Sequence, residues 1–390
     1  MAGDAARARL RDVASREAQP RAPFRSMGGK RGKQKPKRRS KPQEPPRRAP
    51  PDAPPHNFVS EAGAGCHIAH FDASWVVGVD AFDPDDFEDG VALPDLGIDA
   101  DGELPLLTAV NTGDAPRSFF ISTPHACVGA GGRPLARGWT RDDAGVVTPC
   151  TTLVVVVAPK TLVSVAYVSV PPGEELSLDS DVQDFTVRPR SAASQGSEKT
   201  EARFTARQRH ADPAAFDAAH TYAFPLGGAG PYLCTQGVAG EFTHFFAGTH
   251  HAVDFRCPVG TPVLSVAPGR VTEVRMSNTC GGVHVRNLFK WNSIMVAHAD
   301  GTFAEYVHLA HGSARVAVGD TVAEGTHLAD SGDVGFAPEP HLHMQLARSA
   351  ANDAPTLRFA LRDAAGAPYE PLAGRYYSRA GPEPAPAEDD

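Results

Sequence analysis

The stretch DFRCPVGTPVLSVAPGRV occupies residues 254–271 and decides the fold of the last third of the chain. Short apolar or β-branched runs alternate in it with Pro-Val-Gly and Ala-Pro-Gly turns, a pattern typical of strand, tight turn, strand, tight turn, strand. VGDTVAEG at 318–325 and DSGDVG at 330–335 continue the same rhythm. The pattern predicts a small domain of short strands.

Four histidines and one aspartate lie within and beside this β pattern: His250, Asp254, His308, His341 and His343. A histidine and a carboxylate four residues apart, joined by one arm of the later His-x-His pair, supply three ligands for one zinc and leave its fourth position open to water. The remaining histidines are then free to handle protons beside that water. This set of residue types indicates a hydrolytic metal site.

Several motifs coincide with these histidines. YVHL at 306–309 and PHLH at 340–343 follow the His-x-x-x-Asp pair, and the DSGDVG turn precedes the last motif. Together they resemble the lysostaphin and LytM type of zinc metalloendopeptidases, the murein endopeptidase-like family, over roughly residues 221 to 350. The family motifs are His-x-Gly-x-Asp, Tyr-x-His-Leu and Gly-Pro-His-Leu-His after a Ser-Gly-x-x-Gly turn. The chain departs from them at Ala252, at Glu339 and at Met344-Gln345, without losing a candidate ligand.

The resemblance implies a role for each residue. His250, Asp254 and His343 would bind Zn²⁺, and His308 and His341 would form the catalytic pair. The implied fold is a small antiparallel β domain with a groove across one sheet and the metal in the floor of the groove. One histidine would accept the proton of the attacking water, and the other would steady the oxyanion or protonate the leaving amine. Which histidine does which is left open.

The first zinc ligand has an alternative. Phe242-Thr243-His244 resembles a Thr-His element that some relatives place further upstream, so His244 is an alternative to His250. Side chains alternate along a strand, so His250 and His251 cannot both face one metal if that segment is extended. A tetrahedral site needs only one of His244 and His250.

Two function classes fit this reading. The first is a zinc metalloendopeptidase that hydrolyses peptide bonds, and the resemblance implies peptidoglycan stem or crossbridge peptides as its substrate. The second is a catalytically silent protein that uses the groove, with its zinc, to bind or scaffold a peptide or glycan. The completeness of the metal set favours the enzyme.

Charge and composition divide the chain of 390 residues, which is long enough for about two domains. Residues 1–55 hold 16 Lys and Arg against 5 Asp and Glu, whereas the rest holds 22 against 41. The predicted organisation is a disordered basic arm at 1–56, a β-sandwich-like accessory domain at 57–190, a linker with a short helix at 191–220, the peptidase domain at 221–376 and a disordered acidic tail at 377–390. The expected fold class is therefore mainly β.

Runs at 104–110, 118–122, 152–157, 162–170 and 185–187 predict the strands of the accessory domain. The most apolar stretch, Leu153 to Val170, is broken by Pro159-Lys160 and fits two paired strands better than a membrane-spanning helix, so we expect no membrane span. No residues in this domain have the types and spacing of a catalytic motif. We expect it to position the enzyme, to shield its groove, or simply to pack against it.

The basic run at 30–41 fits a nuclear localisation signal, a nucleic-acid or polyanion contact, or a solvated linker. The six cysteines form no Cys-x-x-Cys pair, which disfavours a structural zinc cluster. Their even number and the family resemblance suit an extracytoplasmic enzyme, yet no recognisable signal peptide supports that compartment. Localisation and oligomeric state stay open.

Overall fold

The computed structural model describes residues 66–70, 76–81, 95–98, 105–111, 113, 117–184, 221–238, 244, 248–351, 354 and 356–386. Their regular structure consists of β-strands and short 3-10 turns, so the predicted mainly β class is confirmed. The basic arm, the linker with its predicted helix, the predicted strand at 185–187 and residues 387–390 lie outside the described part. The described residues hold no helix with the length and hydrophobicity that a membrane crossing requires.

The accessory region consists of two sheets that share a core. In the first sheet β10, β5, β8 and β7 are neighbours in that order and β1 runs parallel to β8; in the second the order is β2, β9, β4, β3, with β6 beside β9. Buried side chains of both sheets, among them Phe119, Leu153, Leu107 and Val163, form one apolar cluster, as in a sandwich. The bounds are β1 Cys66–His70, β2 Gly78–Ala81, β3 Asp95–Ile98, β4 Pro105–Asn111, β5 Arg117–Thr123, β6 Ala126–Val128, β7 Gly138–Arg141, β8 Val147–Val157, β9 Thr161–Ser169 and β10 Asp179–Asp184.

The apolar stretch Leu153 to Val170 forms two strands, as predicted, but they do not pair with each other. β8 hydrogen-bonds to β5, β7 and β1, whereas β9 hydrogen-bonds to β4, β2 and β6. The expected pairing of these two strands with each other is therefore wrong. The chain crosses between the two sheets at Ala158–Lys160, so each strand buries one face in the common core.

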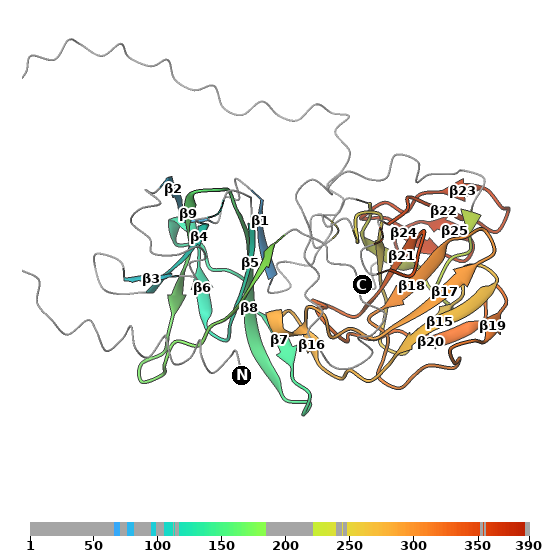
Figure 1. The fold of residues 1–390 in the computed structure, drawn as a ribbon, viewed down its shortest axis with the longest axis horizontal. Helices are drawn as coiled ribbons and strands as arrows, with labels where there is room; N and C mark the ends of the chain where they lie inside the picture. Colours follow the sequence, from blue (N-terminus) through green and yellow to red (C-terminus); the bar gives the residue numbers. More distant parts are fainter. Residues whose placement is uncertain are drawn as a thin grey trace, which may run out of the picture. The chain divides into compact units, whose positions relative to one another are not determined.

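The C-terminal region is built on a nine-stranded sheet in the order β19-β15-β17-β18-β21-β13-β12-β24-β25. Figure 1 labels β15, β17, β18 and β21 of this sheet. Smaller ladders are β11-β22-β23 and β14-β20. The bounds are β11 Thr221–Tyr222, β12 Tyr232–Gln236, β13 Val253–Arg256, β14 Pro262–Leu264, β15 Gly269–Arg275, β16 Gly281–Gly282, β17 Ser293–His298, β18 Phe303–Val307, β19 Thr321–Val322, β20 His327–Asp330, β21 His341–Ala347, β22 Ala360–Arg362, β23 Pro368–Tyr369, β24 Tyr376–Ser378 and β25 Gly381–Glu383. The strands expected from residues 254–271 are β13, β14 and β15.

Residues 377–386 are more ordered than their composition predicts. β24 and β25 pair with each other, and β24 also pairs with β12. Tyr377 is buried and stacks on Tyr369 at a ring-centroid distance of 5.3 Å. Ordering a segment rich in Pro and acidic residues costs chain entropy, and few of its other side chains can be buried to compensate. Burial of the apolar surface of the tyrosines offsets this cost.

β21 lies between β18 and β13, and this order positions the candidate site. His343 is directly opposite Asp254 on one side and Val307 on the other. His308 follows the last residue of β18, and His341 is the first residue of β21. Directly opposed residues of neighbouring strands project from the same face, so the register gathers motifs that are far apart in sequence.

Candidate metal centre and active site

Three buried side chains converge on one point. Asp254 on β13 and His343 on β21 are cross-strand partners, and His244 lies upstream of β13 with none of its surface exposed. The Nε2 atom of His244 is 3.2 Å from Oδ1 of Asp254 and 3.1 Å from Nδ1 of His343, and Nδ1 of His343 is 3.0 Å from the same Oδ1. The three atoms form a nearly equilateral triangle.

Neighbouring acceptors fix where the imidazole protons lie. Nδ1 of His244 faces the carbonyl oxygen of Gly237 at 3.2 Å and therefore carries the proton, which leaves a lone pair on Nε2. Nε2 of His343 faces Oε1 of Gln345 at 3.0 Å, which leaves a lone pair on Nδ1. Two nitrogen lone pairs and a carboxylate oxygen thus face one another without a proton between them.

This arrangement fits a zinc ion. In a tetrahedral site with bonds of about 2.0–2.1 Å, ligand atoms lie about 3.3 Å apart, close to the distances between these three atoms. Oδ1 of Asp254 is also buried without a hydrogen-bond partner among the described residues. Since burying an unpaired charge is costly, a cation is the group that these residues would hold. Of the described residues, these three are the ones grouped closely enough to bind a metal.

The electrostatics of the three side chains keep the Asp254 carboxylate ionised. Burial alone would raise the pKa of Asp254, but the adjacent imidazoles of His244, His341 and His343 hold it well below its usual range. Burial lowers the pKa of His244 against the opposing effect of Asp254. Burial also acts to lower the pKa of His343, yet Asp254 and its other acceptors raise it overall. The carboxylate therefore stays ionised in the centre.

His308 and His341 lie beside this triangle. Nδ1 of His308 donates to the carbonyl oxygen of Val334 at 2.7 Å, and Nδ1 of His341 donates to the carbonyl oxygen of Glu339 at 2.8 Å. Both rings therefore present an unprotonated Nε2, and that of His341 is 3.8 Å from Oδ2 of Asp254. The two ring centroids are 4.5 Å apart.

The surroundings of His308 keep its ring neutral. Burial, reinforced by His341 and His343, holds the pKa of His308 well below its usual range. Its backbone has a φ of 61°, a left-handed conformation that is costly for a residue with a side chain. Surrounding contacts must therefore hold this residue in place, which is common for groups that take part in chemistry.

Further polar residues orient the three side chains of the triangle, and these residues were missed from the sequence. Nε2 of Gln236 donates to Oδ2 of Asp254 at 2.8 Å, and Gln236 is the register partner of Asp254 on β12. Gln345 accepts from His343 and donates to Oε2 of Glu305 at 3.0 Å. Gln345 is two residues after His343, so strand alternation alone was a usable signal for it. Such partners fix the tautomer and orientation of metal ligands.

The two candidates for the first ligand lie in different surroundings. His244 is in the triangle, whereas His250 is partly exposed and packs edge-on against His251 at 4.9 Å. Nδ1 of the buried His251 faces the carbonyl oxygen of Thr356 at 2.7 Å. Residues 248–251 form a turn, so a spacing of four residues from Asp254 does not bring His250 to the carboxylate.

A buried His-Asp-His triangle with two further histidines beside it, on an antiparallel sheet, is the arrangement typical of a mononuclear metal centre of the hydrolytic class. Within the chain, residues 248–355 match the model of Peptidase family M23. This part of the chain is a Peptidase family M23 domain, with zinc as the metal of its family. The match begins four residues after His244.

Curated proteins show the same likeness over a limited length. A stretch of 99 residues is 36% identical to glycyl-glycine endopeptidase ALE-1 of Staphylococcus capitis, covering 25% of this chain and 24% of that protein. The identity to lysostaphin of Staphylococcus simulans is also 36% over 99 residues, covering 25% of this chain and 18% of that protein. Peptidoglycan DD-endopeptidase ShyA of Vibrio cholerae is 30% identical over 97 residues, covering 25% of this chain and 20% of that protein. The chain spans less than a quarter of the length of these relatives.

Proposed function

We propose that the protein is a zinc-dependent endopeptidase that hydrolyses peptide bonds in peptidoglycan stems or crossbridges. The observation that carries this proposal is the triangle of His244, Asp254 and His343, whose three donor atoms face one another without a proton between them. The names of the relatives, which include a glycyl-glycine endopeptidase and a peptidoglycan DD-endopeptidase, support the substrate class.

The proposed ligands are His244, Asp254 and His343. Zinc bound to them would polarise the scissile carbonyl and lower the pKa of a coordinated water. Gln236 orients Asp254 through its second carboxylate oxygen, and Gln345 holds the proton of His343 on Nε2. These contacts keep the ligand lone pairs aimed at one point.

The proposed catalytic pair is His308 and His341. Each keeps its own proton on Nδ1, bound to a backbone carbonyl, and so has Nε2 available to accept the proton of the attacking water. Two buried imidazoles with centroids 4.5 Å apart do not readily both carry a charge. The pair therefore takes up one proton, and the ring that holds it then donates it to the leaving amine.

Zinc content and hydrolysis of purified peptidoglycan test this function in the full chain. We expect the wild type to hold a single zinc and to cleave. His343→Ala should lose both, and His308→Ala should keep the zinc and lose roughly 10²- to 10⁴-fold in rate. His327→Ala is the control, because His327 lies on β20 and pairs with Asp330 rather than with the metal centre.

Zinc retained by the wild type without cleavage of any peptidoglycan would contradict the peptidase proposal and favour a binding role. Absence of zinc from folded protein, in the presence of excess zinc, would overturn the metal centre itself. The polyanion contact of the basic arm remains a prediction on residues outside the described part.

A further inference from the structure

One loop of the peptidase domain supplies the acceptors for both catalytic histidines. This segment, residues 331–340, is called here the Asp333 loop. The carbonyl oxygens of Val334 and Glu339 accept from Nδ1 of His308 and His341. Gly332 in the same loop forms an isolated bridge with His341. The ring orientations at the centre therefore depend on the position of this loop.

The Asp333 loop rests on a second segment, residues 279–288, called here the Gly281 loop. Gly281 bridges Val334, Gly282 bridges Ala337, and the amide of Gly335 donates to the carbonyl of Cys280 at 2.9 Å. A Cβ on Gly281 would lie 2.4 Å from the carbonyl oxygen of Asp333, so only glycine allows this approach. The two loops thus form one packed unit.

The accessory region holds this unit through β7. Gly281 pairs with Arg141 and Gly282 with Thr140, so β16 extends the accessory sheet. The amide of Val283 donates to the carbonyl of Trp139 at 3.0 Å. A Cβ on Gly282, which has a φ of 87°, would lie 2.1 Å from that carbonyl oxygen. This close pairing therefore requires glycine on the peptidase side.

An apolar cluster seals the same contact. Phe120, Cys150 and Val154 of the accessory region pack with side chains of both loops, Val283, Val285 and Phe336. All of these side chains are buried. The contact thus has a core of its own in addition to its hydrogen bonds.

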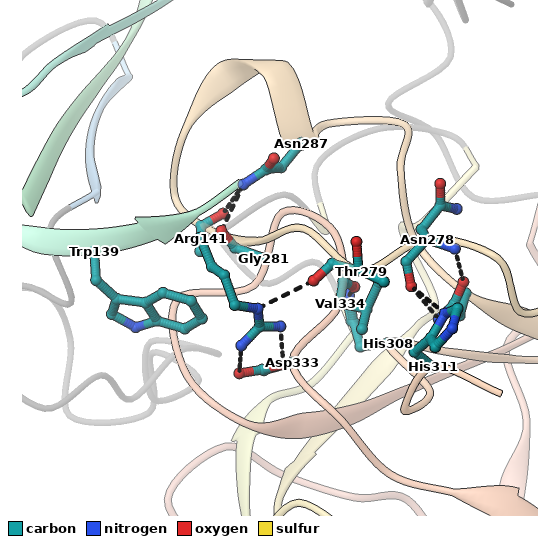
Figure 2. Close-up of polar contacts among 12 residues, drawn as sticks. Trp139, Arg141, Asn278, Thr279, Gly281, Asn287, His308, His311, Asp333 and Val334 are labelled. Carbon is teal, nitrogen blue, oxygen red and sulfur yellow. Dashed lines mark hydrogen bonds and ion pairs between the residues drawn. The ribbon is translucent and has the colours of Figure 1, made fainter. Parts of the chain in front are cut away.

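Arg141 reaches past the Gly281 loop to the Asp333 loop (Figure 2). Its Nη1 and Nη2 donate to Oδ2 and Oδ1 of Asp333 at 2.9 and 2.7 Å, and its Nε donates to the carbonyl of Thr279 at 3.0 Å. The side chains of Arg141 and Asp333 are only 25% and 17% exposed. A bidentate, partly buried pair of this kind fixes geometry as well as charge. Asp333 immediately precedes Val334, the acceptor of His308.

We infer that Arg141 of the accessory region is a positioning residue of the metal centre: its grip on Asp333 holds the Val334 carbonyl against His308. The inference rests on the proposed function, because it gives His308 a role in catalysis. It makes the accessory region a structural part of the active site rather than a separate targeting module. No substrate contact is required of Arg141.

The test compares Arg141→Ala, Arg141→Lys and Asp333→Asn with the control Lys290→Ala in the full, zinc-loaded chain. Lys290 also forms an ion pair across the same two regions, with Asp143 at 3.2 Å, but this pair is exposed and does not touch the Asp333 loop. We expect kcat on a peptidoglycan peptide to fall roughly 10- to 100-fold for Arg141→Ala, with zinc content unchanged. Asp333→Asn should also lower kcat. Arg141→Lys should have a kcat between those of Arg141→Ala and the wild type, because lysine cannot form the bidentate pair that arginine forms with a carboxylate. Lys290→Ala should change kcat less than about twofold.

Nitrogen-15 NMR of the histidine rings gives a readout that does not need activity. The signal of His308, assigned by comparison with His308→Ala, should show a single Nδ1–H form in the wild type and in Lys290→Ala. In Arg141→Ala it should lose that fixed form. An unchanged His308 signal with unchanged kcat in Arg141→Ala would overturn the inference. If the wild type cleaves nothing, the proposed function fails while the NMR comparison still decides whether Arg141 positions His308.

Discussion

The accessory region and the peptidase domain are both assembled from strands, yet two sets of buried polar groups, one in each, differ in how they are satisfied. In the accessory region, Asn111 donates to the carbonyls of Val157 and Ala158 at 3.0 and 3.1 Å, and the hydroxyls of Ser122 and Thr152 are 2.6 Å apart. In the peptidase domain, Oδ1 of Asp254 is buried next to Nε2 of His244 and Nδ1 of His343, and neither nitrogen carries a proton to donate to it.

The difference separates polar groups that stabilise a fold from polar groups that await a ligand. A hydrogen-bonded Asn or Ser in a core offsets its own desolvation, whereas converging lone pairs raise the free energy of the folded chain until a cation arrives. The accessory region contributes to the site indirectly, through the loop that Arg141 holds. The predictions below test this division, beginning with the ligands.

The largest effect should come from the choice between His244 and His250. His244→Ala removes one corner of the triangle, so zinc content should fall from a single ion to near zero and activity should go with it. His250→Ala should keep both, because His250 packs on His251 outside the triangle. Metal analysis after dialysis against a weak chelator distinguishes the variants. The reverse result would assign the first ligand to His250 and remove His244 from the centre.

Adjacent phenylalanines on β5 separate the accessory core from its contact with the peptidase domain. Phe119 packs in the core between the accessory sheets, and Phe120 packs with Val283 and Phe336 of the peptidase domain. Each truncation to alanine should cost about 3–5 kcal/mol of stability, since both side chains are fully buried. Phe120→Ala should increase the hydrogen exchange of amides in the Asp333 loop above the wild-type level, whereas Phe119→Ala should not. Equal exchange in the two variants would mean that the loop does not depend on this contact.

Much of the peptidase half could be predicted from the sequence because its information is local. Turn residues at fixed offsets mark β13, β14 and β15, and the spacing of Asp254 and the His-x-His pair marks two corners of the metal triangle. Two candidates for the third corner were equally visible as residues. In the structure His244 lies beside Asp254 and His343, whereas His250 lies in the turn at 248–251, and spacing does not encode these positions.

What could not be predicted depends on contacts between distant segments. Alternation shows that β8 and β9 are strands, but their partners are chosen by the packing of two whole sheets. Arg141 and Asp333 are 192 residues apart and belong to no motif. Nothing in the dipeptide Gly281-Gly282 itself indicates that it pairs with β7. Such features appear only when the chain is folded.

The hydrogen bond between Gln345 and His343 should matter less than a ligand does. Gln345→Ala removes the acceptor for Nε2–H of His343, so the ring is less firmly held and zinc affinity should fall roughly 10- to 100-fold. A competition titration with a chromogenic chelator measures this change. Glu370→Gln is the matched control, because its partner is Arg358 and neither residue belongs to the metal centre. A Gln345→Ala affinity equal to that of the control would show that the strand backbone alone orients His343.

The smallest effect concerns Asp300, a carboxylate that is satisfied by protein donors and so contrasts with Asp254. Its Oδ1 accepts from the amide and hydroxyl of Thr302 at 2.9 and 2.7 Å, and its Oδ2 accepts from the hydroxyl of Tyr222 at 2.8 Å. Partial burial acts to raise the pKa of Asp300, but these hydrogen bonds lower it overall. A folded pKa below the unfolded value of about 3.9 gives stability that is present above that pH and is lost as the pH falls through the folded pKa. Asp300→Asn should therefore lower stability at neutral pH by less than about 1 kcal/mol, since the carboxylate is mostly exposed, and the two proteins should converge in strong acid. Urea unfolding of zinc-free wild type and variant from pH 2 to pH 7 measures the difference, and a gap that stayed constant over this range would refute the titration of Asp300 as its cause.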